Sequence, residues 1–216
     1  ASLFAWQGDD EPPKAAKGED LLLFVGVLSS AQNGHKRSVI RSSWMQHPQL
    51  ALGGQVTVKF FVGKVGGEDE AADGRKRRRG RTSEEDQLRE EAERFEDVVM
   101  LPLKDSPKGR ARKLLGFLRW YLEEGPRAAY VAKLEDHAYV HVDLLLPLLG
   151  RDLASPSYVA MGLIHECDSS RTVARDGFLA QSAESFPESE YPPYPDGGGY
   201  LLSAPLVEAI GRTYYK

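Results

Sequence analysis

The sequence predicts an α/β protein with a mostly parallel sheet flanked by helices. Short, continuous apolar runs, such as LLLFVGVLSS at 21–30 and AAYVAKL at 128–134, have the composition of strands that are buried on both faces. Between such runs lie amphipathic segments, such as KGRARKLLGFLRWYLEE at 108–124, whose leucines share one face of a helix. Strands that alternate with helices along a chain are typical of a parallel sheet.

Each further element has its own local signal. Pro48 ends the first helical segment, Gly63 closes the second strand, and Ser83 precedes acidic residues that favour a helix N-terminus. We expect strands at 21–30, 55–63, 97–103, 128–134 and 157–164, and helices at 35–46, 83–95 and 108–124. After them we expect a helical turn at 142–150, and then a Pro/Gly turn, a short strand and a helix from 191 onward.

Length and composition limit the classes of protein. The 216 residues suit one domain, and a net charge of -4 argues against a general nucleic-acid binder. Residues 1–20 have neither a basic start nor a long apolar run, so they predict a polar lead-in rather than a signal peptide. Residues 64–82 are rich in Gly, Asp, Arg and Lys, and they predict a mobile basic insertion. Its RKRRRGR stretch is typical of a solvated loop, a processing site, a nuclear address or a polyanion-binding patch.

The stretch KLEDHAYV at 133–140 is a candidate site because three ionisable residues follow an apolar strand directly. Glu135, Asp136 and His137 stand at the carboxyl end of the strand expected at 128–134. Ligands of open α/β sheets bind outside the carboxyl ends of the strands. Clustered carboxylates there indicate a metal ion or a phosphate-linked ligand, and a solvated loop with a surface histidine is the alternative.

Six segments, in order, resemble the motifs of the β-1,3-glycosyltransferases of family 31. They are RSVIRSSW at 37–44, KFFVG at 59–63, Leu88 with Glu91 and Asp97, Asp105-Ser106 with Lys113, KLEDHAYV at 133–140, and YPPYPDGGGYLLS at 191–203. The corresponding family patterns include R-x-x-I-R-x-T-W, K-x-D-D-D-x-F-V and Y-P-x-Y-x-x-G-G-G-Y-V-L-S. Within the family, the first and last segments most resemble the galactosyltransferase that builds the proteoglycan linkage region.

The resemblance implies a GT-A-type domain at 21–216, a UDP-sugar donor, Mn²⁺ and inversion at the anomeric carbon. The expected reaction moves galactose from UDP-galactose to a hydroxyl of a glycan or glycoprotein acceptor, in β-1,3 linkage. The implied setting is the Golgi lumen, with a type II membrane anchor outside this chain.

The same resemblance assigns expected roles to individual residues. Donor contacts are expected from Arg37, Arg41, Asp105, Glu135 and Asp136, metal contacts from Asp136 and His137, and an acceptor side at Tyr194, Gly197, Gly198 and Gly199. Oxygen ligands suit Mn²⁺, which would neutralise the phosphate charge of the leaving UDP. Asp105 could instead cap the following helix, and Tyr194 could instead fill the core.

Three departures from the family pattern keep other functions open. His137 stands where the family has an acid, and PKGRARK at 107–113 lacks the family's Tyr and Asn-Leu-Thr. The family's general base lies in a Glu-Asp pair that we expect beyond Lys216. A non-catalytic nucleotide-sugar-binding relative is therefore an alternative. A cytosolic Rossmann-type binder is a weaker one, because LSSAQNG at 28–34 is not a G-x-G-x-x-G loop.

Overall fold

The computed structural model describes residues 4–5, 21–51, 54–64, 81–106, 109–152, 158–166, 171–177 and 180–214. The expected polar lead-in, apart from Phe4–Ala5, and most of the expected insertion at 64–82 lie outside these residues. The polar lead-in and the mobile basic insertion therefore stay predictions. Within the described residues, no helix is long and apolar enough to cross a bilayer.

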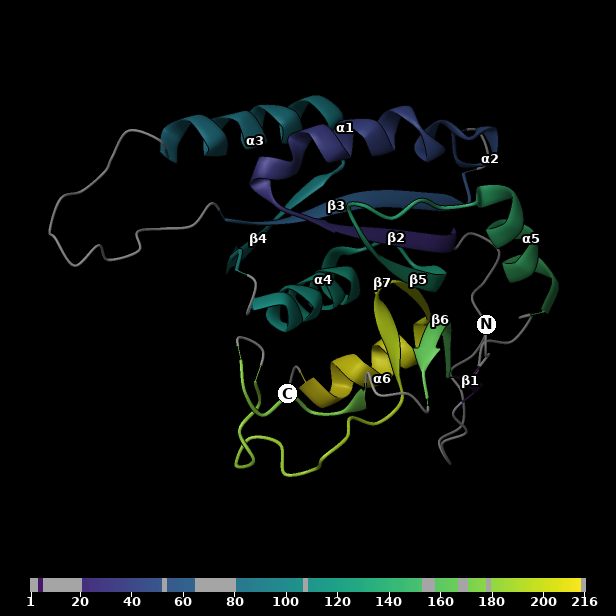
Figure 1. Ribbon diagram of the computed structural model, residues 1–216. Helices are drawn as coiled ribbons and strands as arrows, with labels where there is room; N and C mark the ends of the chain where they lie inside the picture. Colours follow the sequence, from purple (N-terminus) through teal and green to yellow (C-terminus); the bar gives the residue numbers. More distant parts are fainter. Residues whose placement is uncertain are drawn as a thin grey trace, which may run out of the picture.

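The strands of the described residues form one seven-stranded sheet in the order β1-β6-β7-β5-β2-β3-β4 (Figure 1). The strands are β1 (Phe4–Ala5), β2 (Leu21–Ser29), β3 (Val56–Lys64), β4 (Val98–Lys104), β5 (Ala128–Glu135), β6 (Val159–His165) and β7 (Tyr194–Ser203). The helices are α1 (Gly34–Ser42), α2 (Pro48–Ala51), α3 (Arg81–Phe95), α4 (Arg110–Glu124), α5 (Val142–Asp152) and α6 (Ala204–Tyr214), with short 3₁₀ turns η1 (Ala31–Asn33) and η2 (Trp44–Gln46).

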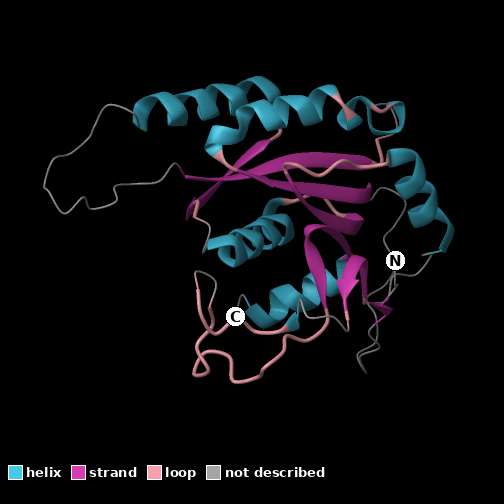
Figure 2. Cartoon of the chain, viewed as in Figure 1, coloured by secondary structure: helices cyan, strands magenta, loops and turns pink. Residues whose placement is uncertain are grey.

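The sheet has a parallel part and an antiparallel part. Strands β5, β2, β3 and β4 run parallel to one another, whereas β7 pairs antiparallel with both β5 and β6. Figure 2 shows the helices on both sides of this sheet. The predicted α/β class is thereby confirmed.

The alternation of side chains along β2 builds a core on each face of the sheet. Phe24 and Leu28 point toward α4 and α6, where they meet Phe117 and Val207. The other set, which includes Val25, packs under α1, η2 and α5, with Ile40, Trp44 and Leu149. Figure 1 shows α1 and α3 above the sheet and α4 and α6 below it. The expected helix at 35–46 is therefore α1 plus η2, with Ile40 and Trp44 packed on the sheet and Val39 exposed.

Two predicted elements differ from the structure. The expected helical turn at 142–150 is the eleven-residue helix α5, which tolerates Pro147 inside it. The expected Pro/Gly turn is shorter and the expected strand longer than predicted, because residues from Tyr194 onward belong to the ten-residue strand β7. Glycine lets β7 lie close to β5: a Cβ at Gly199 would be 2.8 Å from Leu134 Cδ2.

Candidate functional site

A cavity of about 520 Å³ lies where the carboxyl ends of the four parallel strands meet. The segment after β2, the last residue of β3, the residues after β4 and the tip of β5 all line it. These lining residues include Ser29–Asn33 and Lys36, Lys64, Asp105 and Ser106, and Glu135, Asp136 and His137. The predicted position of the site, outside the carboxyl ends of the strands, is thus a cavity in the structure.

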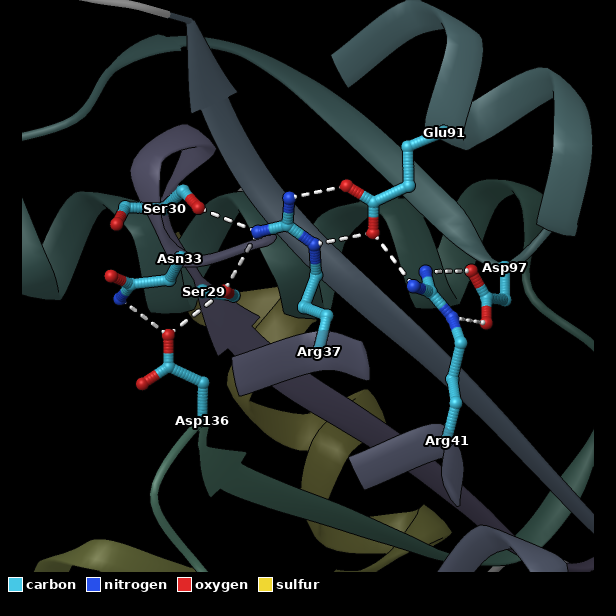
Figure 3. A network of polar contacts seen from close by, with 8 residues as sticks. All are labelled: Ser29, Ser30, Asn33, Arg37, Arg41, Glu91, Asp97 and Asp136. Atoms are coloured by element: carbon cyan, nitrogen blue, oxygen red, sulfur yellow. Dashed lines mark hydrogen bonds and ion pairs between the residues drawn. The ribbon is translucent and has the colours of Figure 1, made fainter. Parts of the chain in front are cut away.

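Asp136 is the buried acid of this cavity, with 7% of its surface exposed. Its Oδ2 accepts hydrogen bonds from Ser29 Oγ at 2.8 Å and from Asn33 Nδ2 at 2.6 Å (Figure 3). Its Oδ1 accepts one from Lys36 Nζ at 3.0 Å. Burial alone would raise the pKa of this carboxyl group. The hydrogen bonds from Lys36, Asn33 and Ser29 outweigh burial and lower that pKa below its ordinary value. Asp136 is therefore ionised and fixed in orientation.

The direction of the Ser29 hydroxyl follows from its two partners. Arg37 Nη1 lies 3.0 Å from Ser29 Oγ, and an arginine can only donate hydrogen bonds. Ser29 Oγ must then accept from Arg37 and give its own proton to Asp136. A chain of hydrogen bonds thus runs from α1 through the end of β2 to the tip of β5.

The two arginines of α1 are paired with acids rather than aimed into the cavity. Arg37, only 1% exposed, donates from Nε and Nη2 to Glu91 at 2.8 and 2.6 Å, and from Nη1 to the Ser30 carbonyl. Arg41 binds both oxygens of Asp97 at 2.7 and 2.8 Å and also contacts Glu91 at 2.8 Å. Figure 3 shows this network joining α1 to α3 and to the start of β4.

This geometry assigns Arg37 and Arg41 to a structural network. Neither arginine lines the cavity, whereas Lys36, the residue before Arg37, does. The residues expected to contact the donor are therefore divided: Asp105, Glu135 and Asp136 lie at the cavity, and the two arginines lie behind it. Arg37 is joined to the cavity lining through Ser29 and Ser30.

Each carboxylate oxygen of Asp105 accepts a hydrogen bond from another element of the fold. Its Oδ2 accepts a hydrogen bond from the Gly63 amide at 3.1 Å, and its Oδ1 accepts one from Lys113 Nζ at 2.6 Å. Lys113 also donates to the Ser29 carbonyl. Asp105 does not cap α4, whose N-cap residue is Gly109 without a side-chain cap. Asp105 and Lys113, the two ends of the altered family segment, are thus in direct contact.

A second cavity, of about 560 Å³, adjoins the first on the side of β7. The two cavities share four lining residues, Leu28, Arg110, Glu135 and His137. The second cavity is also lined by Pro195, Asp196, Gly197, Gly198, Tyr200 and Lys133. Glu135 and His137 therefore stand on the boundary between a cavity at the parallel strands and a cavity at the glycine-rich strand.

Lys133 connects this boundary to the glycine strand. Its ammonium, on a residue with 6% of its surface exposed, lies 2.5 Å from Glu135 Oε1 and 2.5 Å from the Gly197 carbonyl. Burial and then the charge of Glu135 raise the pKa of the Tyr200 phenol to about 12. Tyr200 therefore stays protonated near neutral pH and offers an O–H donor rather than a base.

The remaining residues expected on the acceptor side lie close by. Tyr194 packs against the His165 ring, with centroids 5.0 Å apart, and is not part of either cavity lining. His165 Nε2 lies 3.3 Å from Asp196 Oδ2. Hydrogen bonds from the Gly198 amide and from His165 lower the pKa of Asp196. Gly197 and Gly198 line the second cavity, and Gly199 instead allows the close approach of β7 to β5.

The protein ligands available to a divalent cation are few. Among the described residues, no group of three or more His, Cys, Asp or Glu side chains is placed to hold a metal. Asp136 and His137 are adjacent at the first cavity and supply one carboxylate and one imidazole. This donor set fits a cation that is bound by one or two side chains and by the phosphates of a substrate. It does not fit a cation held by protein ligands alone.

Comparison with known proteins identifies the class of this chain. A galactosyltransferase family model matches residues 35–214, which include Arg37, Arg41 and all lining residues of the two cavities except those at 28–33. The chain therefore belongs to the galactosyltransferase family. The resemblance to this family that the sequence motifs predicted is confirmed.

Curated relatives share the domain but are longer proteins. A hydroxyproline O-galactosyltransferase of Arabidopsis thaliana is 27% identical over 211 residues, covering 98% of this chain and 27% of that protein. A β-1,3-galactosyltransferase of the same plant is 29% identical over 192 residues, 89% of this chain and 27% of that protein. A human acetylgalactosaminyl-O-glycosyl-glycoprotein β-1,3-N-acetylglucosaminyltransferase is 31% identical over 209 residues, 93% of this chain and 50% of that protein. The chain thus spans a quarter to a half of the length of these relatives.

Proposed function

We propose that this chain is the donor-binding part of an inverting β-1,3-glycosyltransferase that uses a UDP-sugar, with galactose as the expected sugar. The observation that carries this proposal is the pair of adjoining cavities with Glu135 and His137 between them. A transfer reaction needs two substrates whose reacting atoms meet at one place. The first cavity suits a donor, and the second suits an acceptor hydroxyl.

The first cavity offers what a nucleoside diphosphate sugar needs. Lys36, Lys64, Arg110 and Lys113 bring positive charge to its lining, and the first turn of α1 begins at its wall. Backbone N–H groups at a helix N-terminus and lysine ammonium groups both attract phosphate. Asp136 and His137 would hold Mn²⁺ together with the diphosphate oxygens. The bound ion would neutralise the charge that develops on the departing UDP.

The second cavity supports the acceptor side. Asp196, the backbone at Gly197 and Gly198, and the Tyr200 phenol supply hydrogen-bonding groups of the kind that sugar hydroxyls require. Lys133 holds Glu135 as an ion pair, so Glu135 is suited to orienting the donor sugar rather than to removing a proton. We propose that the general base comes from outside residues 1–216, as the family resemblance implies.

We propose a lumenal Golgi domain of a type II membrane protein, whose acceptors are glycans or glycoproteins. Relatives that act in protein glycosylation support this setting.

A screen of donor hydrolysis over UDP-sugars, with and without Mn²⁺, tests the function. We expect UDP-galactose to be hydrolysed fastest, and Asp136→Asn to weaken UDP binding about tenfold or more, because the anchor of the metal is lost. Asp143→Asn is the matched control, since Asp143 is an exposed acid of α5 away from both cavities. UDP binding without hydrolysis of any donor would favour a non-catalytic nucleotide-sugar-binding relative. No binding of any uridine nucleotide would overturn the proposal.

A further inference from the structure

The two oxygens of Asp136 differ in the kind of partner that each one holds. Oδ2 is bound by two neutral groups from buried or half-buried residues, Ser29 and Asn33. Oδ1 is bound by the ammonium of Lys36, at 3.0 Å. A cation that approaches Asp136 from the cavity therefore reaches the oxygen that already holds a positive charge.

Lys36 is able to leave this contact, unlike its neighbour Arg37. The side chain of Lys36 is 45% exposed, whereas that of Asp136 is 6% exposed. An ion pair with one solvated partner contributes little to stability, so breaking it is easy. Arg37, with 1% of its surface exposed and four hydrogen bonds, holds the same helix turn in place while the Lys36 side chain moves.

We propose that Lys36 is an exchangeable counter-ion, which neutralises Asp136 in the empty site and transfers to the donor diphosphate when a divalent cation takes Asp136 Oδ1. This inference rests on the proposed function of the first cavity. Two cations cannot share one carboxylate oxygen without strong repulsion, so the divalent ion displaces the ammonium. Lys36 lines the first cavity, in which the proposed function places the donor phosphates.

The exchange predicts a particular pattern of binding. Mn²⁺ alone must displace Lys36 and therefore binds weakly. UDP alone must draw Lys36 away and leave Asp136 uncompensated, so it also binds weakly. When Mn²⁺ and UDP are both present, each ligand removes the obstacle to binding of the other. The gain in affinity must then be the same whichever of them is titrated first.

Titration calorimetry of Lys36→Met with MnCl₂, with UDP and with both tests this pattern. We expect Mn²⁺ alone to bind about tenfold more tightly, because the competing charge is gone. We expect UDP alone to bind about tenfold more weakly, as for the loss of a hydrogen bond to a charged group. The coupling between the two ligands should fall accordingly. Lys36→Gln, which keeps a hydrogen-bond donor for Asp136, should shift Mn²⁺ affinity in the same direction if Lys36→Met unfolds.

Lys64→Met is the matched control, because Lys64 lines the same cavity from the end of β3. A general effect of removing one positive charge would alter both affinities equally in the two variants. Equal shifts of the Mn²⁺ and UDP affinities in Lys36→Met and Lys64→Met, or no shift in Lys36→Met, would overturn the exchange. Such a result would not contradict the proposed function, provided that the wild-type chain binds UDP. Failure of the wild-type chain to bind UDP, with or without Mn²⁺, would instead overturn the proposed function, and the exchange with it.

Discussion

Arg37 and Glu91 form a two-point ion pair, with Nε to Oε1 at 2.8 Å and Nη2 to Oε2 at 2.6 Å. The pair joins α1 to α3, and its arginine also binds Ser29, which in turn holds Asp136. A contact between two helices on one face of the sheet is therefore connected to the acid of the cavity. The following predictions test this connection and the packing that supports it.

Glu91→Gln should destabilise the protein by about 3–5 kcal/mol, because it leaves a buried arginine without its countercharge. Urea denaturation measures the loss. Glu85→Gln on the same helix is the control: Glu85 pairs with Arg89 in an exposed i,i+4 contact, and its loss should change stability by about 0.5 kcal/mol or less. A similar small change in both variants would show that the Arg37–Glu91 pair adds little to stability.

Ser29→Ala should destabilise the protein by about 1–3 kcal/mol and also weaken UDP binding, because Asp136 loses a donor and Arg37 loses an acceptor. Ser203→Ala separates the two effects. Ser203 is fully buried and accepts a hydrogen bond from the Val159 amide, at 3.0 Å, away from both cavities. It should reduce stability without altering UDP affinity in calorimetry. Unchanged UDP affinity in Ser29→Ala would contradict the proposed link between the network and the cavity.

The stability of the protein should fall as the pH is lowered through the carboxyl range. Burial would raise the pKa of Glu91, but hydrogen bonds from Arg37 and Arg41 lower it below its ordinary value of 4.5. The pKa of Asp136 is likewise lowered below its ordinary value of 3.8, because hydrogen bonds from Lys36, Asn33 and Ser29 outweigh its burial. A carboxyl group whose pKa is lower in the folded state stabilises the fold fully above about pH 5, and this contribution is lost as the pH falls through the folded pKa.

Urea midpoints measured from pH 7 to pH 3 check this sign. Asp136→Asn should show a shallower fall than the wild type, since asparagine does not ionise. A midpoint that stays constant or rises toward pH 3 would contradict the assigned pKa shifts.

Gly26→Ala should destabilise the protein by about 1–3 kcal/mol through overpacking. A Cβ at Gly26 would lie 2.3 Å from Phe117 Cε2, so the glycine lets α4 rest on the middle of β2. Phe117→Leu in the same chain should recover part of the loss, measured by urea denaturation. At Gly197 a Cβ would meet nothing within 4 Å, so Gly197→Ala should stay within about 0.5 kcal/mol of wild type.

Much of the parallel part of the fold could be predicted because its signals are local. Apolar runs such as 21–30 and 128–134 are largely buried, and the last residues of β2, β3 and β5 are polar and line the cavity. The position of Asp136 was predicted from the rule that ligands of open α/β sheets bind outside the carboxyl ends of the strands. The strand expected after residue 191 was too short because Pro and Gly are depleted in strands, and here pairing with β5 and β6 outweighs that propensity.

The partners of the site residues could not be predicted from local patterns. Arg37 and Arg41 lie one helical turn apart, and Glu91 and Asp97 lie on a distant segment. An arginine that binds phosphate and one that binds a buried carboxylate have the same sequence pattern. The contact between Lys36 and Asp136 was also missed, because a lysine among basic residues on a helix is typical of a solvated face. The packing of α1 beside α3 and β4 gives the two arginines their carboxylate partners, and the approach of α1 to the tip of β5 gives Lys36 its contact with Asp136.

The insertion of β7 between β5 and β6 has a consequence for how the chain is made. Synthesis proceeds from the N-terminus, so β5 and β6 leave the ribosome well before the strand that joins them. Until Tyr194–Ser203 emerges, one edge of β5 has no neighbour, and β6 can pair with β1 but not with the rest of the sheet. Unpaired strand edges in a nascent chain promote misassembly and recruit chaperones. A ribosome-bound chain halted before residue 194 should therefore be sensitive to protease in β6, while the β2–β3–β4 part is already protected.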